Sequence, residues 1–214
     1  MESEKKESIS ATRRRRLSPA DRREQILDAA LACCIRNASF EVSMIEVARE
    51  VGVSRNLVYH YFSNQDTLMN AMISREAQTI QSRIAEIPFS TPEETMFSVI
   101  LEYLRTMTRN VEALRTALAT PRIREKVSPH LEELQELVAM RLAEALGFSW
   151  SGTVKNALLS GANFILHLVR EAGRDLHLAE DAAAELCVNV CRQAAEGAAR
   201  IDRETSAAMQ TAAH

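Results

Sequence analysis

Helix-start signals recur along this chain, and each is followed by apolar residues at α-helical spacing. Ser18 and Ser43 are two such starts, because a serine hydroxyl accepts a hydrogen bond from a free backbone N–H of the first helical turn. No segment alternates apolar and polar residues as a half-buried strand does. With 46% hydrophobic residues and only 5 prolines among 214 residues, the sequence predicts an all-α protein with a substantial core.

The N-terminal end is basic although the whole chain has a formal net charge of −3. Residues 13–36 hold seven arginines against three acidic residues, a local sum of +4. Residues 1–17 have almost nothing to bury, so we expect them to be a disordered arm. Four consecutive arginines close this arm: Arg13, Arg14, Arg15 and Arg16. An anionic partner would meet this end first. The alternative is that the four arginines belong to a solvated tail with no partner, since such a tail can have the same composition.

Two short helices meeting at a glycine are predicted over residues 43–62, after a first helix over residues 19–37. Ser43 and Glu46 form a capping box, in which each side chain satisfies a free backbone N–H of the other. Gly52 stands where the chain must turn, and Ser54 caps the following helix. This pattern predicts a helix-turn-helix, whose second helix enters the DNA major groove.

The second of these helices has an outward face with the chemistry of DNA recognition. Arginine can bond guanine O6 and N7 together, asparagine can bond adenine N6 and N7, and tyrosine hydroxyls suit phosphate oxygens. Phe62 is instead the better candidate for the core. The exposed candidates are Arg55, Asn56, Tyr59, His60 and Tyr61.

The stretch from Phe40 to Leu68 resembles the DNA-binding domain of the tetracycline-repressor (TetR) family. The match comprises an aromatic before the first short helix, Val47-Ala48, Gly52-Val53-Ser54, the run Val58-Tyr59-His60-Tyr61-Phe62, and Asp66 with Leu68. The resemblance implies a homodimer of subunits with about nine helices. Each subunit would have an N-terminal three-helix DNA-binding domain and a C-terminal ligand-binding and dimerisation domain, and its commonest action would be repression.

Individual roles also follow from the resemblance. Ser43 and Tyr59 would hold phosphates, Arg55, Asn56 and Tyr61 would lie closest to the bases, and the arginine arm could add phosphate or minor-groove contacts. Ser54, His60 and Gln65 complete the candidate DNA-binding residues. Gln65 departs from the family, which usually has a phosphate-binding lysine there, so we expect the arm to supply more of the electrostatic affinity.

The predicted domains follow helix signals along the rest of the chain. After the DNA-binding domain, residues 18–63, the cap Ser63-Asn-Gln-Asp66 opens a connecting helix, residues 64–87, which ends before Pro88. Pro121 is expected to break the helical region, and Ser128-Pro129 to open another helix. Long helices are predicted over 151–172 and 179–201. The ligand-binding and dimerisation domain would span residues 88–204, followed by a flexible tail, residues 205–214.

The last two predicted helices carry small residues on apolar faces, which would let them pair with their copies in a four-helix dimer interface. The same faces could partly cover the subunit's own core. An effector pocket is expected among the predicted helices between residues 91 and 172, for an unknown small molecule that is apolar or amphipathic. Its candidate lining residues are Met96, Tyr103, Met107, Met140, Asn163, Phe164 and His167.

Other function classes have little support in the sequence. No nucleophile motif, phosphate-binding glycine loop or acid/base cluster indicates an enzyme, and we expect no cofactor or metal. The cysteines, including Cys187 and Cys191, lack zinc-site spacing. No targeting or membrane-spanning segment is apparent, so a cytoplasmic protein is expected. The alternative function is a regulator-like helical protein that acts mainly through protein–protein contacts.

Overall fold

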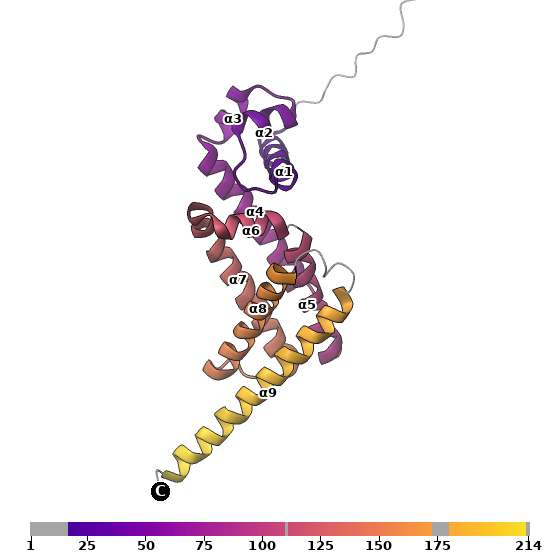
Figure 1. The fold of residues 1–214 in the computed structure, drawn as a ribbon, viewed down its shortest axis with the longest axis vertical. Coiled ribbons are helices and arrows are strands. Elements are labelled where there is room, and N and C mark those ends of the chain that lie inside the picture. Colours follow the sequence, from indigo (N-terminus) through magenta and orange to yellow (C-terminus); the bar gives the residue numbers. More distant parts are fainter. Residues whose placement is uncertain (1–16, 110, 173–179, 213–214) are drawn as a thin grey trace, which may run out of the picture.

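The computed structural model describes residues 17–109, 111–172 and 180–212, and these form nine α-helices and no strand, as the sequence predicts. The expected basic arm lies outside the described residues, apart from Leu17. The helices, shown in Figure 1, are α1 (Pro19–Asn37), α2 (Met44–Val51), α3 (Arg55–Tyr61), α4 (Gln65–Ala85), α5 (Pro92–Arg109), α6 (Val111–Ala119), α7 (Pro121–Leu146), α8 (Gly152–Ala172) and α9 (Glu180–Ala212).

Helices α1 to α3 form a compact group at one end of the molecule, which we call the head (Figure 1). Residues close in sequence set each of its helix starts. The Ser18 hydroxyl accepts a hydrogen bond from the Asp21 N–H at 3.0 Å, and Ser43 and Ser54 cap α2 and α3. Gly52 turns the chain between α2 and α3 at φ 74°, a conformation that other residues rarely adopt.

Helix α4 leaves the head and runs into the remaining helices, α5 to α9, which we call the body (Figure 1). It is capped by Asn64 rather than Ser63, because the Asn64 side chain accepts a hydrogen bond from the Thr67 N–H at 2.9 Å. Successive turns of α4 contact α7 through polar pairs. These pairs are Asp66 with Arg122, Asn70 with Lys126, and Ser74 with His130.

Helix α7 corrects one expectation from the sequence. It begins at Pro121 and continues through Pro129, so Ser128-Pro129 does not open a helix. A proline suits the first helical turn, where its missing N–H would have no partner. The lost hydrogen bond at Pro129 is offset because α7 buries a continuous apolar stripe against its neighbours, which includes Val127 and Leu134.

Helices α8 and α9 pack against each other at the far end of the body. Helix α9 continues to Ala212, so residues 205–212 are helical rather than the expected flexible tail, and its last turns project beyond the other helices (Figure 1). Most residues on the apolar faces of these two helices are buried within the chain, which agrees with the alternative that the faces partly cover the subunit's own core. The buried residues include Leu158, Ala162, Ile165 and Cys187.

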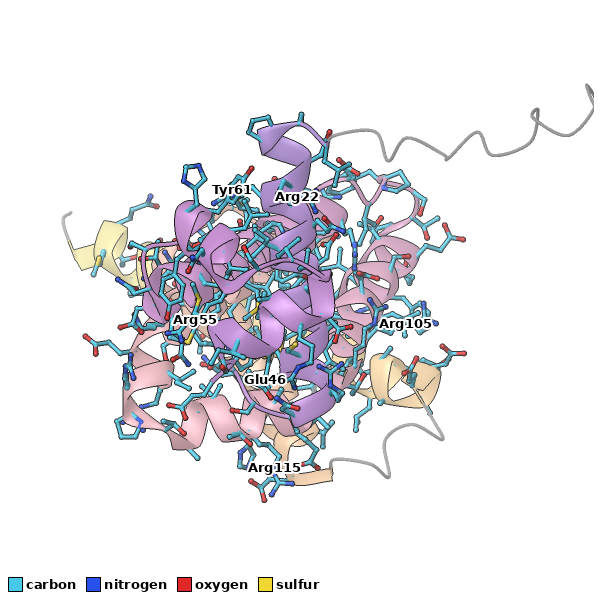
Figure 2. All side chains as sticks on the ribbon, turned by 90° about the horizontal axis from the view of Figure 1, so that it is seen from above. Arg22, Glu46, Arg55, Tyr61, Arg105 and Arg115 are labelled. Atoms are coloured by element: carbon cyan, nitrogen blue, oxygen red, sulfur yellow. The ribbon has the colours of Figure 1, made fainter. Side chains whose placement is uncertain are left out.

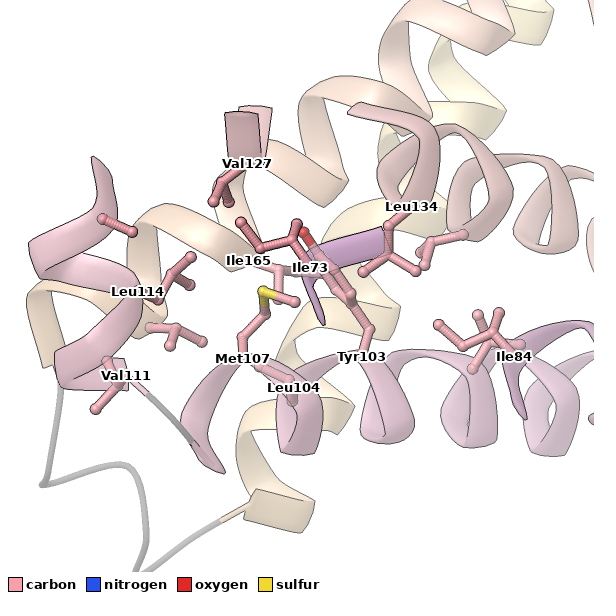
Figure 3. Close-up of a cluster of buried hydrophobic side chains, with 14 of the residues drawn as sticks. Ile73, Ile84, Tyr103, Leu104, Met107, Val111, Leu114, Val127, Leu134 and Ile165 are labelled. Atoms are coloured by element: carbon pink, nitrogen blue, oxygen red, sulfur yellow. The ribbon is translucent and has the colours of Figure 1, made fainter. Parts of the chain in front are cut away.

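The body core centres on α5. Tyr103, Leu104 and Met107 extend from this helix toward buried residues of α4, α7 and α8 (Figure 3). Along the described ranges, no helix is long and apolar enough to cross a membrane.

Candidate nucleic-acid interface

The outward face of α3 presents the polar residues that the sequence singled out. Arg55, Asn56, Tyr59 and His60 are all exposed, whereas Val58 on the opposite face is fully buried. Viewed onto the head, Arg55 and Tyr61 lie on the end of the molecule formed by the first helices (Figure 2). A seven-residue helix with this division of faces can insert its polar side into a groove while the head core holds it in place.

Arg55 and Tyr59 support each other on this face. They are four residues apart and therefore share one side of the helix. The Arg55 Nη2 donates a hydrogen bond to the Tyr59 hydroxyl at 3.1 Å, and the guanidinium lies 5.0 Å from the centre of the tyrosine ring. This contact holds an otherwise flexible guanidinium on the surface, where it can bond a base edge or a phosphate.

The two serines hold the starts of the short helices. The Ser43 hydroxyl accepts a hydrogen bond from the Ile45 N–H at 3.2 Å, and the Ser54 hydroxyl accepts one from the Leu57 N–H at 3.3 Å. Each hydroxyl still has its own proton to donate. Both serines therefore fix helix position and leave a donor for a phosphate oxygen.

Tyr61 and Gln65 are less accessible than the other candidates. Tyr61 is half-buried and packs against the head core, with its ring 5.5 Å from that of His60 in an edge-on arrangement. Gln65 is the first residue of α4 and is also half-buried. Phe62 is buried in the head core, which confirms its expected place.

Two basic residues near the interface were not among the candidates. Arg22 is half-buried on α1 and appears in the same end-on view as Arg55 (Figure 2). The exposed Arg23 lies over the Phe62 ring, with its guanidinium carbon 5.3 Å from the ring centre. The arginine-rich composition of residues 13–36 was the available signal for both.

Comparison with known proteins agrees with this geometry. The model of the family described as "Bacterial regulatory proteins, tetR family" matches residues 26–72, which span most of the head and the first turns of α4. The chain belongs to the TetR family. It is therefore a DNA-binding transcriptional regulator, built as an N-terminal helix-turn-helix followed by a helical domain.

Relatives of this TetR-family chain include regulators from several bacteria. It is 28% identical to the HTH-type transcriptional regulator BetI of Pectobacterium atrosepticum over 134 residues, or 61% of this chain and 68% of BetI. It is 32% identical to the HTH-type transcriptional repressor KstR of Rhodococcus jostii over 90 residues, 42% of each chain. A TetR-family regulator from Streptomyces coelicolor has the same fold, with a TM-score of 0.70, 20% identity, and coverage of 89% of this chain and 87% of that one.

A cavity of about 140 Å³ lies where the head meets the body of this TetR-family regulator. Its walls come from α1, α4, α5, α6 and α7, with Phe40 from the loop after α1. Most of the lining is apolar. Glu76, Thr106 and His130 are its polar residues.

Only Met107 of the seven expected effector-pocket residues lines this cavity. Met96 and Tyr103 are fully buried in the body core, and Met140 is exposed. The remaining three, Asn163, Phe164 and His167, lie on the exposed face of α8. Helical periodicity gives the face on which a residue lies, but it could not distinguish a face that lines a cavity from one that lies in the core or on the surface.

The body cysteines have no feature of a reactive thiol. Cys187 and Cys191 are fully buried, and burial raises the pKa of their thiols to about 11 and about 12. A thiol reacts as its thiolate, which such a pKa disfavours. Among the described residues, no three or more His, Cys, Asp or Glu side chains cluster as metal ligands.

Proposed function

We propose that this regulator acts as a homodimeric repressor, which binds a palindromic operator in the cytoplasm and leaves it when a small molecule binds the body. The observation that carries the proposal is the exposed α3 face, where Arg55 is held by Tyr59. In this proposal residues 18–63 bind DNA, residues 64–87 connect, and residues 88–204 bind the ligand and dimerise.

The proposed contacts follow the chemistry of each side chain. Arg55 and Asn56 read base edges, because their side chains can form paired hydrogen bonds in the major groove. Tyr59, Ser43 and Ser54 bond phosphate oxygens and fix the position of the head on the duplex. Tyr61 lies near the bases beside Arg55 and Asn56, as the family resemblance implies. His60, Gln65 and the arm arginines add contacts to the DNA backbone, and the arm also reaches the minor groove.

Dimerisation is proposed through the outward faces of α8 and α9. Large apolar side chains stay exposed there in the single chain: Phe164 is 40% exposed, Leu186 52% and Ile201 54%. Val190 and Gly197 lie at helical spacing between the last two, which leaves a strip where a second helix can approach closely. A second copy of α8 and α9 would cover these faces symmetrically.

Selection of bound duplexes from a random DNA pool tests the DNA-binding role. We expect a palindrome whose two halves are separated by about one helical turn. The double variant Arg55→Ala, Tyr59→Ala should bind the selected duplex roughly 100-fold more weakly, because it loses a base contact and a phosphate contact. Circular dichroism should show an unchanged fold, since both side chains are exposed. If no motif were enriched at low salt, the protein-contact function would replace this proposal.

The dimer is tested separately by sedimentation. Leu186→Glu should convert the dimer to a monomer, because each interface would bury two unpaired carboxylates. Glu185→Gln is the matched control, since Glu185 is also exposed on α9 but points away from the proposed strip. A dimer that persists in Leu186→Glu would place the interface elsewhere.

A further inference from the structure

The cavity at the junction of head and body has a size that restricts its occupant. Its volume is about 140 Å³, and apolar protein cavities of about 150 Å³ bind molecules of the size of benzene. Leu31 of α1 and Phe40 belong to the head, whereas Met107 and Leu134 belong to the body. An occupant would therefore touch both parts of the molecule at once.

A cluster of acidic residues lies beside the cavity. Arg75 of α4 is its basic centre: its Nη1 is 2.8 Å from the Asp28 carboxylate and 3.2 Å from that of Glu24, both on α1. Its Nε and Nη2 donate to Glu76 Oε1 at 3.1 and 2.8 Å. The Arg75 guanidinium therefore faces three carboxylates, and Arg23 also pairs with Glu24 at 3.3 Å. Three carboxylates against two guanidinium groups leave the cluster with one negative charge in excess.

Glu76 belongs both to this cluster and to the cavity wall. We infer that the cavity binds a small cationic amphiphile, whose single apolar ring fills the cavity and whose ammonium group bonds Glu76. The excess of carboxylates favours a cation there, and the apolar lining favours the ring.

Binding at Glu76 would act on the head through Arg75. The ligand ammonium and the Arg75 guanidinium would share one carboxylate, which weakens the hold of Glu76 on Arg75. Arg75 in turn joins α4 to α1, and Asp28 lies one helical turn before Leu31 in the cavity wall. The regulatory consequence rests on the proposed function: an occupied cavity would shift α1 relative to α4 and lower operator affinity.

A second hollow beside the cavity could instead indicate an anionic ligand. It shares Ile73 and His130 with the cavity and also holds Lys126, which could attract an anion. Lys126, however, already donates to the Asn70 side chain at 3.0 Å and lies 4.0 Å from the Asp66 carboxylate. His130 likewise contacts Ser74 at 3.4 Å and Glu133 at 3.5 Å. The observations thus favour a cation at Glu76 over an anion here.

Three probes with one ring and different charges test the inference on the full chain: benzylamine, benzyl alcohol and benzoate. Methionine-methyl NMR signals report the site, because Met72 and Met107 line the cavity while Met140 and Met209 are exposed elsewhere. We expect benzylamine to bind most tightly and to shift the Met72 and Met107 signals without shifting the other two. Tighter binding of benzoate, equal binding of all three, or no shift at the two cavity methionines would overturn the inference.

Two variants that each remove one charge test the role of charge. Glu76→Gln should weaken benzylamine about tenfold and leave benzyl alcohol nearly unchanged, because only the charged hydrogen bond is lost. Arg75→Gln should strengthen benzylamine several-fold, because it removes the competing cation. A purely structural role for Arg75 would instead weaken both probes alike.

The DNA measurement separates this inference from the proposed function. Benzylamine binding is read by NMR without DNA, so it can succeed even if no operator is found. If the operator is found but the amine does not bind, the inference alone fails. If the amine binds and saturating benzylamine leaves operator affinity unchanged, the coupling through Arg75 is wrong.

Discussion

The head and the body of this regulator are held together by different kinds of interaction. In the head, side chains close in sequence bond the first turns of all three helices, as Ser18, Ser43 and Ser54 do. In the body, α7 starts after Thr120 without a side-chain cap, and its position depends on packing against other helices. The starts of the three head helices are therefore set by local contacts, whereas the start of α7 in the body depends on contacts between distant segments.

The head and the body also differ in the polarity of their surfaces and in the hydrogen bonding of their cores. The recognition face of the head is polar, which suits a charged duplex, whereas the body exposes Phe164 and Leu186, which suit another protein. Among the described residues, the buried side-chain polar atoms without a hydrogen bond are all in the body, on Tyr103, Arg141 and Arg192. The body thus tolerates buried polar atoms without hydrogen bonds, which the described part of the head lacks, because the larger body core buries more apolar surface.

Removal of the largest head core side chain should have the largest effect on stability. Phe62 is 1% exposed, so Phe62→Ala should cost about 3–5 kcal/mol and unfold the head. We expect complete loss of operator binding, with α8 and α9 still paired in the dimer. Urea denaturation and sedimentation would measure the two effects.

Tyr59→Ala is the matched control for that variant, because Tyr59 is an aromatic residue of the same short helix but is 37% exposed. It should weaken DNA binding with little change in the free energy of unfolding. Equal destabilisation by the two variants would contradict the assignment of Phe62 to the core and Tyr59 to the surface.

In the body, a close contact between two helices makes one small substitution costly. A Cβ added at Gly161 of α8 would lie 2.7 Å from Cys191 Sγ of α9. Gly161→Ala should therefore cost about 1–3 kcal/mol, because the helices must separate or the thiol must rotate. Chemical denaturation would measure this cost.

Cys191→Ala provides the control for the Gly161 contact. If the clash with sulfur causes the loss, the double variant Gly161→Ala, Cys191→Ala should be more stable than the sum of the two single effects. Strict additivity of the two effects would show that the close approach is not what limits Gly161.

The head could be predicted from the sequence better than the body, for the same physical reason. A capping box and a positive-φ glycine fix structure within a few residues, so Ser43, Glu46 and Gly52 could be interpreted directly. In the body, Pro129 resembled a helix start, but packing of the whole α7 stripe carries the helix through it. Such an effect depends on helices that lie far away in sequence.

The candidate sites show the same limit. The exposed face of α3 followed from helical spacing, and Arg55 and Tyr59 lie together on it. The junction cavity could not be predicted, because its wall combines Leu31, Glu76 and His130, which come from three helices. Helical spacing gives the face of each helix but not the neighbour that the face meets.

The smallest expected effect comes from a variant that removes one unpaired polar group from the body core. Tyr103 is fully buried, its hydroxyl has no hydrogen-bond partner within the described residues, and burial raises the pKa of the phenol above its usual range. Tyr103→Phe removes a desolvated polar group and keeps the ring, so it should stabilise the protein by up to about 1 kcal/mol. Urea denaturation would measure the gain, and a loss of stability would mean that the hydroxyl has a partner, such as the nearby Gln135 amide or a water molecule. In that case only the Nε atoms of Arg141 and Arg192 would remain as buried side-chain polar atoms without a hydrogen bond in the described part of the body. The contrast with the head would then rest mainly on the helix starts and the exposed apolar faces.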